Sequence, residues 1–464
     1  MNASLIPYLT YKDSGVPWLG MVPKQWDVQP ALAVYKPRQV KNTGMVEKTV
    51  LSLSYGRIIV KPPDKLRGLV PESFETYQIV EPGNIIVRTT DLQNDQTSLR
   101  IGHAKDRGII TSAYMCLETT DRVSNEFGYQ YLNTYDLMKI IYGYGSGLRQ
   151  NLDFSHIKRM PVLVPPPDEQ AAIVRFLDHA DRRIRRYIRA KQKLIKLLEE
   201  QKQAIIHRAV TRGLDPHVHL KPSGVEWLGD VPEHWAVRRA KYLFREVDYR
   251  SATGTEELLS LRMYQGLVPH TSVSTIPIST PSLVGFKKVT PGQLVMNRMR
   301  AAIGMFGVVP QAGLVSPDYA VFVPGKHVDP EYYLLLFKTR AAGMIFRIES
   351  KGLGTGSSGF MRLYTDRFGI IKLPVPSLEE QRSIICGVAE MTLELDATLN
   401  RIVREIDLLR EYRTRLIADV VTGKLDVRAA AAILPEKPGA VDEVEAIEAG
   451  DMDEGENLEE GVDE

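Results

Sequence analysis

Arginine and amide side chains follow two apolar runs that recur in this 464-residue chain. Residues 88–94 (RTTDLQN) follow the run NIIV, and residues 297–300 (NRMR) follow QLVM at the equivalent place. An arginine guanidinium can donate two hydrogen bonds to guanine O6 and N7, and an Asn or Gln amide can form two with adenine. Both loops therefore contain the chemistry that reads base edges in a DNA groove.

Two further pairs of loops have the same character. Residues 54–57 (SYGR) match residues 262–265 (RMYQ), and an arginine follows a glycine-rich loop in each half of the chain. A solvated loop or a structural ion pair is the alternative reading of each. Because the flanking residues match between the two copies while these loop side chains differ, we favour two domains that share one scaffold and read different DNA sequences. The candidate DNA-binding residues are Ser54, Tyr55, Arg57, Arg88, Thr89, Gln93, Asn94, Arg149, Arg262, Tyr264, Gln265, Asn297, Arg298, Arg300 and Arg362.

Motifs of catalytic and metal sites are missing from the sequence. VTGKL has Leu425 where a phosphate-binding loop needs Ser or Thr, and neither HExxH nor GxSxG occurs. Residues 354–359 (GTGSSG) match GxGxxG without the strand and helix that give this pattern its meaning. His217 and His219 lack a third ligand nearby, and two cysteines cannot form a zinc site by themselves. We predict no catalytic residue, cofactor site or metal site in this chain.

The net charge of +2 conceals an asymmetry along the chain. Residues 436–464 contain 13 Asp/Glu and one Lys, a net charge of −12, so residues 1–435 carry +14. A basic folded part favours a polyanionic partner, whereas the acidic tail has too few apolar groups to bury and is predicted to be disordered. No apolar run approaches the ~20 residues of a membrane helix, and no signal peptide is evident, so we expect a cytoplasmic protein with no membrane partner.

The chain is an internal duplication. Residues 14–31 (SGVPWLGMVPKQWDVQPA) and 223–240 (SGVEWLGDVPEHWAVRRA) are identical at 11 of 18 positions. LVPPPDEQ matches PVPSLEEQ, and AVTRGLD matches VVTGKLD, at an offset of 211. The two tryptophan-bearing motifs are predicted to pack the indoles against the strands. The chain therefore consists of two copies of one unit of about 210 residues.

Each copy has a strand-rich part followed by a long helix. Short runs rich in Val, Ile, Tyr and Thr alternate with turn residues in 14–160 and 223–372. Proline-free segments with apolar residues at 4-3 spacing then run from 168 to about 211 and from 378 to about 422, which favours a coiled coil. The predicted apolar seam comprises Ile173, Leu177, Ala180, Ile184, Tyr187, Lys191, Leu194, Leu198, Gln201 and Ile205, then Ile384, Val388, Met391, Leu395, Thr398, Ile402, Glu405, Leu409, Tyr412 and Leu416.

Local signals define the helix ends. Ser377 and Glu380 form a capping box at the second start, the first start has only the acidic turn of Asp168 and Glu169, and a glycine follows each end. The two helices can cover each other as an antiparallel pair; pairing with another protein is the alternative. The basic run 182–193 (RRIRRYIRAKQK) wraps polar faces of the first helix, where solvation competes with phosphate contact.

These motifs, in this order, resemble the specificity (S) subunit of type I restriction–modification systems over about residues 12–428. The resemblance implies an α+β fold with two globular α/β target-recognition domains, joined by two long helices that form an antiparallel coiled coil, in a pseudo-two-fold duplication. The predicted parts are domain 1 (1–164), a central helix (165–213), domain 2 (214–375), a C-terminal helix (376–428) and a disordered acidic tail (429–464).

The resemblance also implies a non-catalytic function. Each domain would read one half of a bipartite target in double-stranded DNA, and the helices would dock two methyltransferase (modification) subunits. S-adenosylmethionine would bind in those partner subunits, and restriction/translocase subunits would join through the complex. The alternatives are a site-specific DNA methyltransferase with an unrecognised cofactor site, and a coiled-coil scaffold protein.

Overall fold

The computed structural model describes residues 5–62, 73–90, 92, 95, 98–144, 151–274, 278–353 and 360–435. They form two compact units. Unit 1 comprises described residues up to 190 together with 404–435, and unit 2 comprises 191–403. Helix α4 (Pro167–Arg212) and helix α8 (Leu378–Val421) each contribute one part to either unit. The predicted five-part division, with its boundaries at the helix ends, stays a prediction.

Each unit contains a four-stranded antiparallel sheet with the same strand order. In unit 1 the order is β4 (Tyr35–Arg38), β11 (Tyr114–Thr119), β8 (Ile85–Arg88) and β9 (Ile101–His103). In unit 2 it is β16 (Phe244–Val247), β23 (Tyr319–Pro324), β20 (Leu294–Asn297) and β21 (Phe306–Val308). Arg88 lies opposite Tyr114, and Asn297 lies opposite Tyr319. The shared topology and register confirm the internal duplication.

Four short two-stranded antiparallel pairs correspond between the units, and the described part of unit 2 contains one more, β24 with β25. Unit 1 contains β1 (Tyr11–Asp13) with β2 (Met21–Pro23), β3 (Asp27–Pro30) with β12 (Pro161–Val164), β5 (Leu51–Ser54) with β6 (Arg57–Val60), and β7 (Gln78–Val80) with β10 (Gly108–Ile110). Unit 2 contains β13 (Leu220–Pro222) with β14 (Asp230–Pro232), β15 (Ala236–Arg239) with β26 (Lys372–Val375), β17 (Leu259–Arg262) with β18 (Gly266–Pro269), β19 (Lys287–Val289) with β22 (Gly313–Val315), and β24 (Lys351–Leu353) with β25 (Phe360–Arg362).

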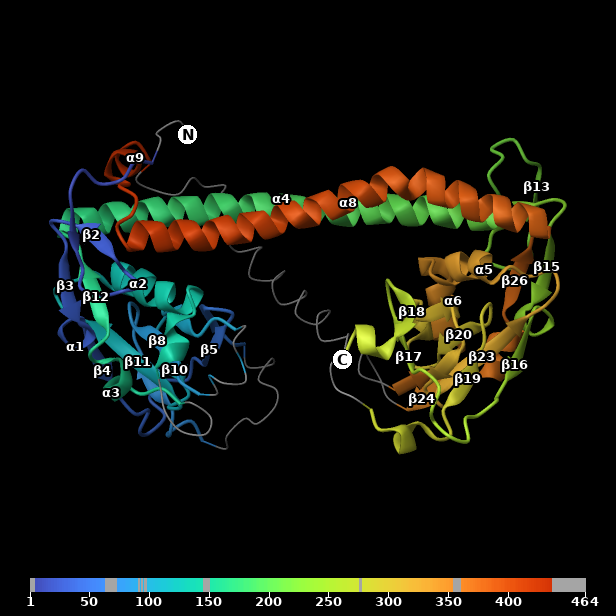
Figure 1. Ribbon diagram of the computed structural model, residues 1–464, viewed down its shortest axis with the longest axis horizontal. Coiled ribbons are helices and arrows are strands. Elements are labelled where there is room, and N and C mark those ends of the chain that lie inside the picture. The colour runs from blue at the N-terminus through green and yellow to red at the C-terminus, as the bar shows by residue number, and fades with distance from the viewer. Residues whose placement is uncertain are drawn as a thin grey trace. The chain divides into compact units, whose positions relative to one another are not determined.

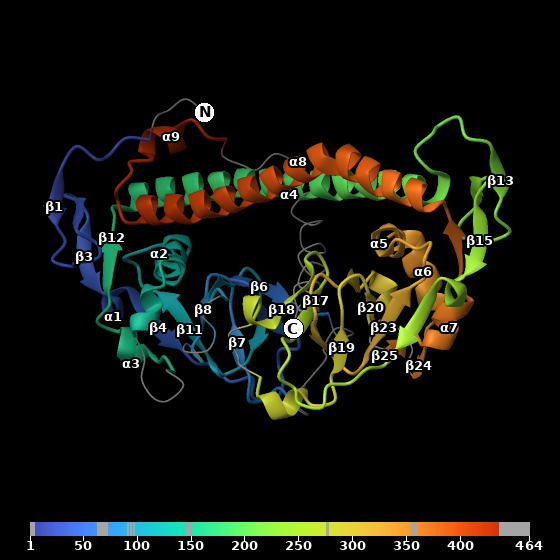
Figure 2. The ribbon, with the colours of Figure 1, turned by 45° about the vertical axis from the view of Figure 1, so that its right-hand side comes forward.

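Helices cover the sheets. In unit 1, α2 (Asn125–Leu137) lies between the sheet and α4, and in unit 2, α5 (Pro330–Phe337) lies between the sheet and the long helices (Figures 1 and 2). Tyr131 and Tyr135 of α2 donate hydrogen bonds to the Pro161 carbonyl at 3.0 and 2.7 Å. The remaining helices are α1 (Ala31–Val34), η2 (Ile140–Gly143), α3 (Phe154–Ile157), η3 (Ala240–Tyr242), η4 (His270–Ser272), η5 (Thr280–Leu283), η6 (Ala301–Ile303), α6 (Arg340–Glu349), α7 (Thr365–Ile370) and α9 (Arg428–Ala432).

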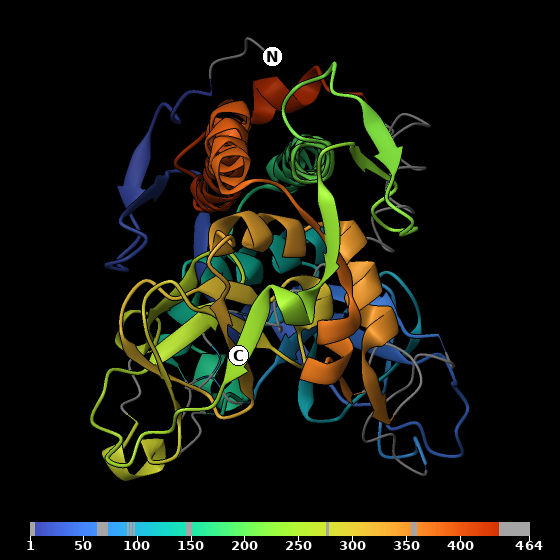
Figure 3. The same cartoon turned by 90° about the vertical axis from the view of Figure 1, so that its right-hand side faces the viewer.

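Within each unit, the segments of α4 and α8 pack side by side (Figures 1 and 3). In unit 1, Asp181 pairs with Arg413, while Arg175 donates to the carbonyl of Leu434, beyond the end of α8. In unit 2, Lys202 pairs with Asp396, and Leu214 packs on Gly387. Contacts move backwards along α8 as they move forwards along α4. The predicted antiparallel pairing is confirmed in each unit.

The apolar seam differs from the predicted one by a residue at several positions. Tyr187, Leu194, Met391 and Tyr412 are exposed by 44–53%, whereas Thr392 is buried and Ile188, Ile195 and Arg413 are partly buried. The departure is local, because predicted seam residues further along α8, such as Ile402 and Leu416, are buried.

The helix ends follow the sequence signals. Glu380 N–H donates to Ser377 Oγ at 3.2 Å, and Ser377 N–H donates to Glu380 Oε2 at 3.1 Å, which confirms the capping box. Gly213 (φ 77°) and Gly423 (φ 76°) end α4 and α8 in the left-handed region that favours glycine.

The start of the predicted tail is folded. Helix α9 begins at Arg428, and Ala430 and Ala431 are buried in the core of unit 1. The prediction of disorder from residue 429 is therefore wrong for 429–435, because this stretch is alanine-rich and precedes the acidic composition. Residues 436–464 lie outside the described residues. No helix among the described residues is long and apolar enough to cross a membrane.

Candidate nucleic-acid interface

A tryptophan–glutamate contact joins the strand-rich part of each unit to the first turn of a long helix. Trp26 Nε1 donates to Glu169 Oε2 at 2.7 Å, and Trp235 Nε1 donates to Glu380 Oε1 at 3.1 Å. Trp26 and Trp235 are buried, as predicted for these motifs. The sequence predicts only an acidic first turn at Glu169, although tryptophan and glutamate recur at equivalent positions of the two copies.

The residue after each glutamate, Gln170 or Gln381, forms a second contact. We call the Trp–Glu contact and this glutamine contact together the clamp. The side-chain oxygen of Gln170 accepts from Ser124 N–H at 2.8 Å, and its amide donates to the Arg122 carbonyl at 3.0 Å. In unit 2, Gln381 accepts from Asp329 N–H at 2.8 Å and donates to the His327 carbonyl at 3.0 Å. Ser124 and Asp329 are the N-caps of α2 and α5. The repeated glutamine thus fixes each sheet-covering helix to its long helix, next to the glutamate that binds the tryptophan.

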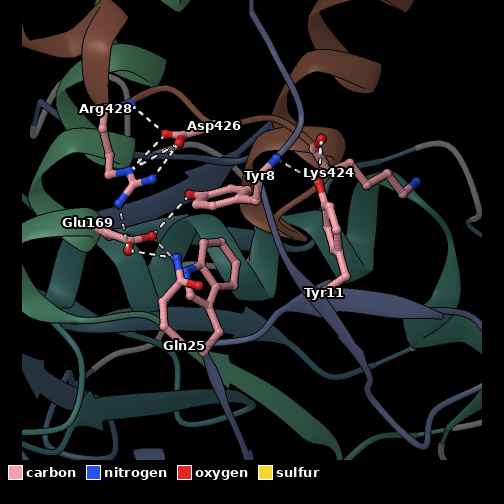
Figure 4. Close-up of polar contacts among 8 residues, drawn as sticks. Tyr8, Tyr11, Gln25, Glu169, Lys424, Asp426 and Arg428 are labelled. Carbon is pink, nitrogen blue, oxygen red and sulfur yellow. Dashed lines mark hydrogen bonds and ion pairs between the residues drawn. The ribbon is translucent and has the colours of Figure 1, made fainter.

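In unit 1, residues near both ends of the described chain complete the surroundings of Glu169. Figure 4 shows Tyr8, Gln25 and Arg428 around the carboxylate: Tyr8 Oη donates at 3.1 Å, Gln25 Nε2 donates at 3.0 Å, and Arg428 Nη1 lies 3.5 Å away. Arg428 also pairs with Asp426 at 2.6 Å, and its hydrogen bonds lower the pKa of Asp426. Burial, reinforced by the charge of Glu169, raises the pKa of Tyr8. The neutral phenol is therefore the form that donates to the carboxylate.

In each unit a β-hairpin packs on the edge strand of the four-stranded sheet, β9 or β21. That edge strand lies next to β8 or β20, the strand that leads into the candidate loop. Gly102 of β9 lies directly against Leu53 and Ile58 of the β5–β6 hairpin, and Gly307 of β21 lies against Leu261 and Leu267 of β17–β18. A Cβ at either glycine would lie 2.6–2.7 Å from a leucine methyl of the hairpin, which would have to shift, so glycine permits the close approach. The hairpins are thereby held over the edge strand next to β8 and β20.

The hairpin tips display aromatic rings to solvent. Tyr55 is 62% exposed and occupies, with Gly56, a two-residue turn whose φ angles are 46° and 77°. Tyr264 is 92% exposed. Ser54 and Arg57 close the first hairpin opposite each other, and Arg262 pairs with Gly266 in the second, while Gln265 lies exposed within its loop. Both tips have the exposure that a DNA contact requires.

At the end of β8, the two predicted residues have different environments. Arg88 Nη1 lies 3.1 Å from Asp95 Oδ2, and its side chain remains 32% exposed. Thr89 is buried, and its hydroxyl donates to the Ala113 carbonyl at 2.7 Å, which gives it a packing role. Gln93, Asn94 and Arg149 lie outside the described residues.

In unit 2 the predicted residues gather at Asp318 and Tyr319. Burial raises the pKa of Tyr319, while the charges of Arg300 and Arg262 and a hydrogen bond with Asn297 lower it. The Asn297 side chain also accepts from the backbone N–H of Met299 at 3.0 Å. The structure thus brings together three segments that are distant in sequence: the β17–β18 hairpin, the loop after β20 and strand β25.

Two arginines of this group take part in ion pairs. Arg298 Nη2 donates to Glu246 Oε1 at 2.7 Å and Nη1 donates to the Asp318 carbonyl at 3.1 Å, leaving the side chain 21% exposed. Arg362 Nη1 lies 3.7 Å from Asp318 Oδ1, and its side chain is 39% exposed. Arg298 is thus the more enclosed of the two. A structural ion pair is the alternative that the sequence leaves open for such residues.

The basic run of α4 forms contacts within its own helix. Arg185 Nε donates to Asp181 at 2.7 Å, and Arg183 lies over the Tyr187 ring at 5.5 Å. Phosphate contact by this run stays a prediction. Among the described residues, no group of three or more His, Cys, Asp or Glu side chains could hold a metal ion.

The chain resembles known proteins in sequence and in fold. Residues 48–197 match the family described as type I restriction modification DNA specificity domain. Two specificity subunits of type I restriction enzymes from Methanocaldococcus jannaschii are similar: MjaX (21% identity; 60% of this chain and 63% of the relative) and MjaVIII (21%; 69% and 75%). The alignment thus spans less than two thirds of MjaX. A chain in a solved structure of a type I R-M system shares the fold (TM-score 0.59, 13% identity, 87% of this chain and 99% of that chain).

Proposed function

We propose, from the chain's membership of the type I restriction–modification specificity subunits, that it is the non-catalytic component that reads a bipartite target in double-stranded DNA. Unit 1 would read one half-site and unit 2 the other. The carrying observation is that equivalent strand ends carry different side chains: Arg88 ends β8, whereas Asn297 ends β20. A conserved frame with altered polar groups is what two readers of different sequences need.

The hairpin tips supply a second element of this interface. Tyr55 and Tyr264 each place an aromatic ring in solvent beside a half-buried arginine, Arg57 or Arg262. A tyrosine can contact sugar or apolar base edges, and an arginine can bind either a phosphate or guanine. The hairpin and the adjacent strand end would then approach the same groove.

Selection from a duplex library with random sequence tests the proposal. The full-length chain, purified with the subunits that co-elute, should enrich one motif with two specified halves and an unspecified spacer. Its affinity for unrelated duplex should fall steeply with salt, as phosphate contacts require. Enrichment of no motif, or of one with a single uninterrupted block, would contradict bipartite reading.

The partners are also a proposal. We expect two methyltransferase subunits, each with its own S-adenosylmethionine, to dock on equivalent surfaces of α4 and α8, with restriction/translocase subunits joining this complex in the cytoplasm. Leu197 and Leu408 occupy equivalent positions at the offset of 211 and are 53% and 55% exposed, which suits two similar apolar contacts. Native mass spectrometry should give a saturated complex with two such subunits. One subunit at saturation would contradict the duplicated docking surface.

A further inference from the structure

A buried arginine lies at the end of the loop that follows β8. Arg100 is 0% exposed, and its backbone carbonyl accepts from Arg88 N–H at 2.8 Å, which places it at the base of this loop. Its guanidinium Nη1 donates to the Thr90 carbonyl at 2.7 Å, and Nη2 donates to the Asp95 carbonyl. Both carbonyls belong to the loop between Arg88 and Arg100. The Arg100 side chain therefore binds the loop backbone at two positions.

A tyrosine from a separate element supports this guanidinium. Tyr142 of η2 accepts a hydrogen bond from Arg100 Nε at 3.1 Å and lies 5.3 Å from the guanidinium carbon, ring centroid to Cζ. The same hydroxyl lies 3.2 Å from the Asp95 carbonyl. Tyr142 and Arg100 therefore converge on the backbone of one residue, Asp95.

Asp95 connects this support to a candidate reader. Its carboxylate accepts from Ser98 N–H at 2.9 Å through Oδ1 and pairs with Arg88 Nη1 at 3.1 Å through Oδ2. The contacts run from Tyr142 through Arg100 and Asp95 to Arg88. A shift of the Asp95 backbone would move the carboxylate that orients the Arg88 fork.

The second copy closes the same loop in another way. Asn297 N–H donates to the Met305 carbonyl at 3.0 Å, so Met305 is the counterpart of Arg100. That loop is four residues shorter and contains η6, whose backbone closes it: Gly304 N–H donates to Ala301 at 2.9 Å, and Met305 N–H donates to Arg300 at 3.2 Å. The buried side chain of Met305 need not donate hydrogen bonds to this loop, because backbone hydrogen bonds already close it.

Burying a guanidinium is costly, and a core position of this kind is ordinarily apolar, as Met305 is. We infer that Arg100, through its contacts with Tyr142 and the Thr90 and Asp95 carbonyls, is a positioning residue for Arg88 and sets base preference in the half-site read by unit 1. This inference rests on the proposed function. Arg100 itself contacts no DNA in this arrangement.

The test compares R100M with the wild-type chain in the co-purified complex. Met is the residue at the counterpart position 305 and removes every donor of the guanidinium. Selection from the random duplex library should give a motif relaxed in one half and unchanged in the other. Affinity for the wild-type motif should fall about tenfold or more, the cost of one misplaced forked contact, while affinity for unrelated duplex stays the same. Hydrogen exchange in peptides covering residues 88–100 should accelerate.

Two variants keep the test decisive. R107M makes the same chemical change in unit 1 at a side chain that is 56% exposed, and should alter neither motif nor exchange. Y142F removes only the hydroxyl and should loosen the same half of the motif to a smaller degree; it decides the matter if R100M does not fold. A wild-type chain that enriches no motif would overturn the proposed function. A folded R100M, or Y142F in its place, that keeps the wild-type motif and exchange rates would overturn the inference alone.

Discussion

Replacing Glu169 by Gln should weaken the attachment of the strand-rich part of unit 1 to the first turn of α4. The equivalent change in unit 2, E380Q, should weaken the attachment to α8 far less. The side chain of Glu169 is 4% exposed and accepts from Trp26, Gln25 and Tyr8 at 2.7, 3.0 and 3.1 Å. A hydrogen bond to a charged group contributes about 1.5–3 kcal/mol, against about 0.5–1.5 for a neutral one. Three bonds that lose about 1 kcal/mol each predict a cost of about 2–4 kcal/mol.

The counterpart should respond weakly because water reaches it. The side chain of Glu380 is 36% exposed, and it accepts from His234 at 2.6 Å, from Trp235 at 3.1 Å, and from the N–H and hydroxyl of Ser377 at 3.1 and 3.0 Å. Solvent can replace part of what the amide loses, so E380Q should cost less than about 1 kcal/mol. The two substitutions remove the same charge from equivalent positions; the sites differ in burial and in the exposed capping box that Glu380 forms with Ser377.

Hydrogen exchange resolved by peptide measures both costs in the full chain. Opening free energies at residues 160–175 should fall in E169Q, and those at 371–386 should change little in E380Q. D168N is the matched control, because Asp168 lies exposed in the same first turn and loses the same charge, at a cost limited to the helix-dipole contribution of about 0.3–1 kcal/mol. Equal costs for E169Q and E380Q, or an effect of D168N as large as that of E169Q, would refute the reasoning.

Four further outcomes are expected. R88A should relax one half of the selected motif and R298A the other, each by ~1–3 kcal/mol if the arginine forks to guanine; a change in both halves from either variant would contradict separate readers. Inserting one heptad into both α4 and α8 adds ~10 Å of helix, equivalent to roughly three base pairs, so mapped methylation sites should keep both halves and lengthen the spacer. Truncation after Pro435 should leave the motif unchanged, and a new motif would place the acidic tail in readout. Partial burial raises the pKa of Glu380, but hydrogen bonds from His234 and Trp235 lower it below its ordinary value, so its stabilisation should vanish as pH falls through that depressed pKa; an acid titration of exchange at 371–386 should be flatter in E380Q.

Periodic and repeated features of the sequence predicted the architecture because they follow from local geometry. The duplication, the long helices, the capping box at Ser377 and the terminal Gly213 and Gly423 all depend on residues near one another in the chain. The apolar seam failed locally at Tyr187 and Met391, although Ile402 and Leu416 further along α8 are buried as predicted. Which of two neighbouring side chains turns inward depends on packing against the facing helix, which lies far away in the sequence.

The candidate interface was harder to predict because its contacts join distant segments. Arg298 was identified as polar and accessible from its loop, but Glu246, which pairs with it, lies 52 residues earlier. Arg100 carries no such signal, because a single arginine between a polar stretch and a short strand has no periodicity or spacing to mark it. The alignment of the two copies did contain a signal for the clamp: tryptophan, glutamate and glutamine recur together, although composition alone does not show that they touch.

The two copies separate what must stay constant from what can vary. Trp26 with Glu169 and Trp235 with Glu380 fix the frame in both units, and Gly102 and Gly307 let the hairpins lie over the same edge strand. The loop after the central strand is then free to differ, being closed by its own backbone in unit 2 and by the guanidinium of Arg100 in unit 1. A loop held by one buried side chain can change length and polar residues without disturbing the sheet. Specificity can therefore diverge between the units while the helical frame stays the same.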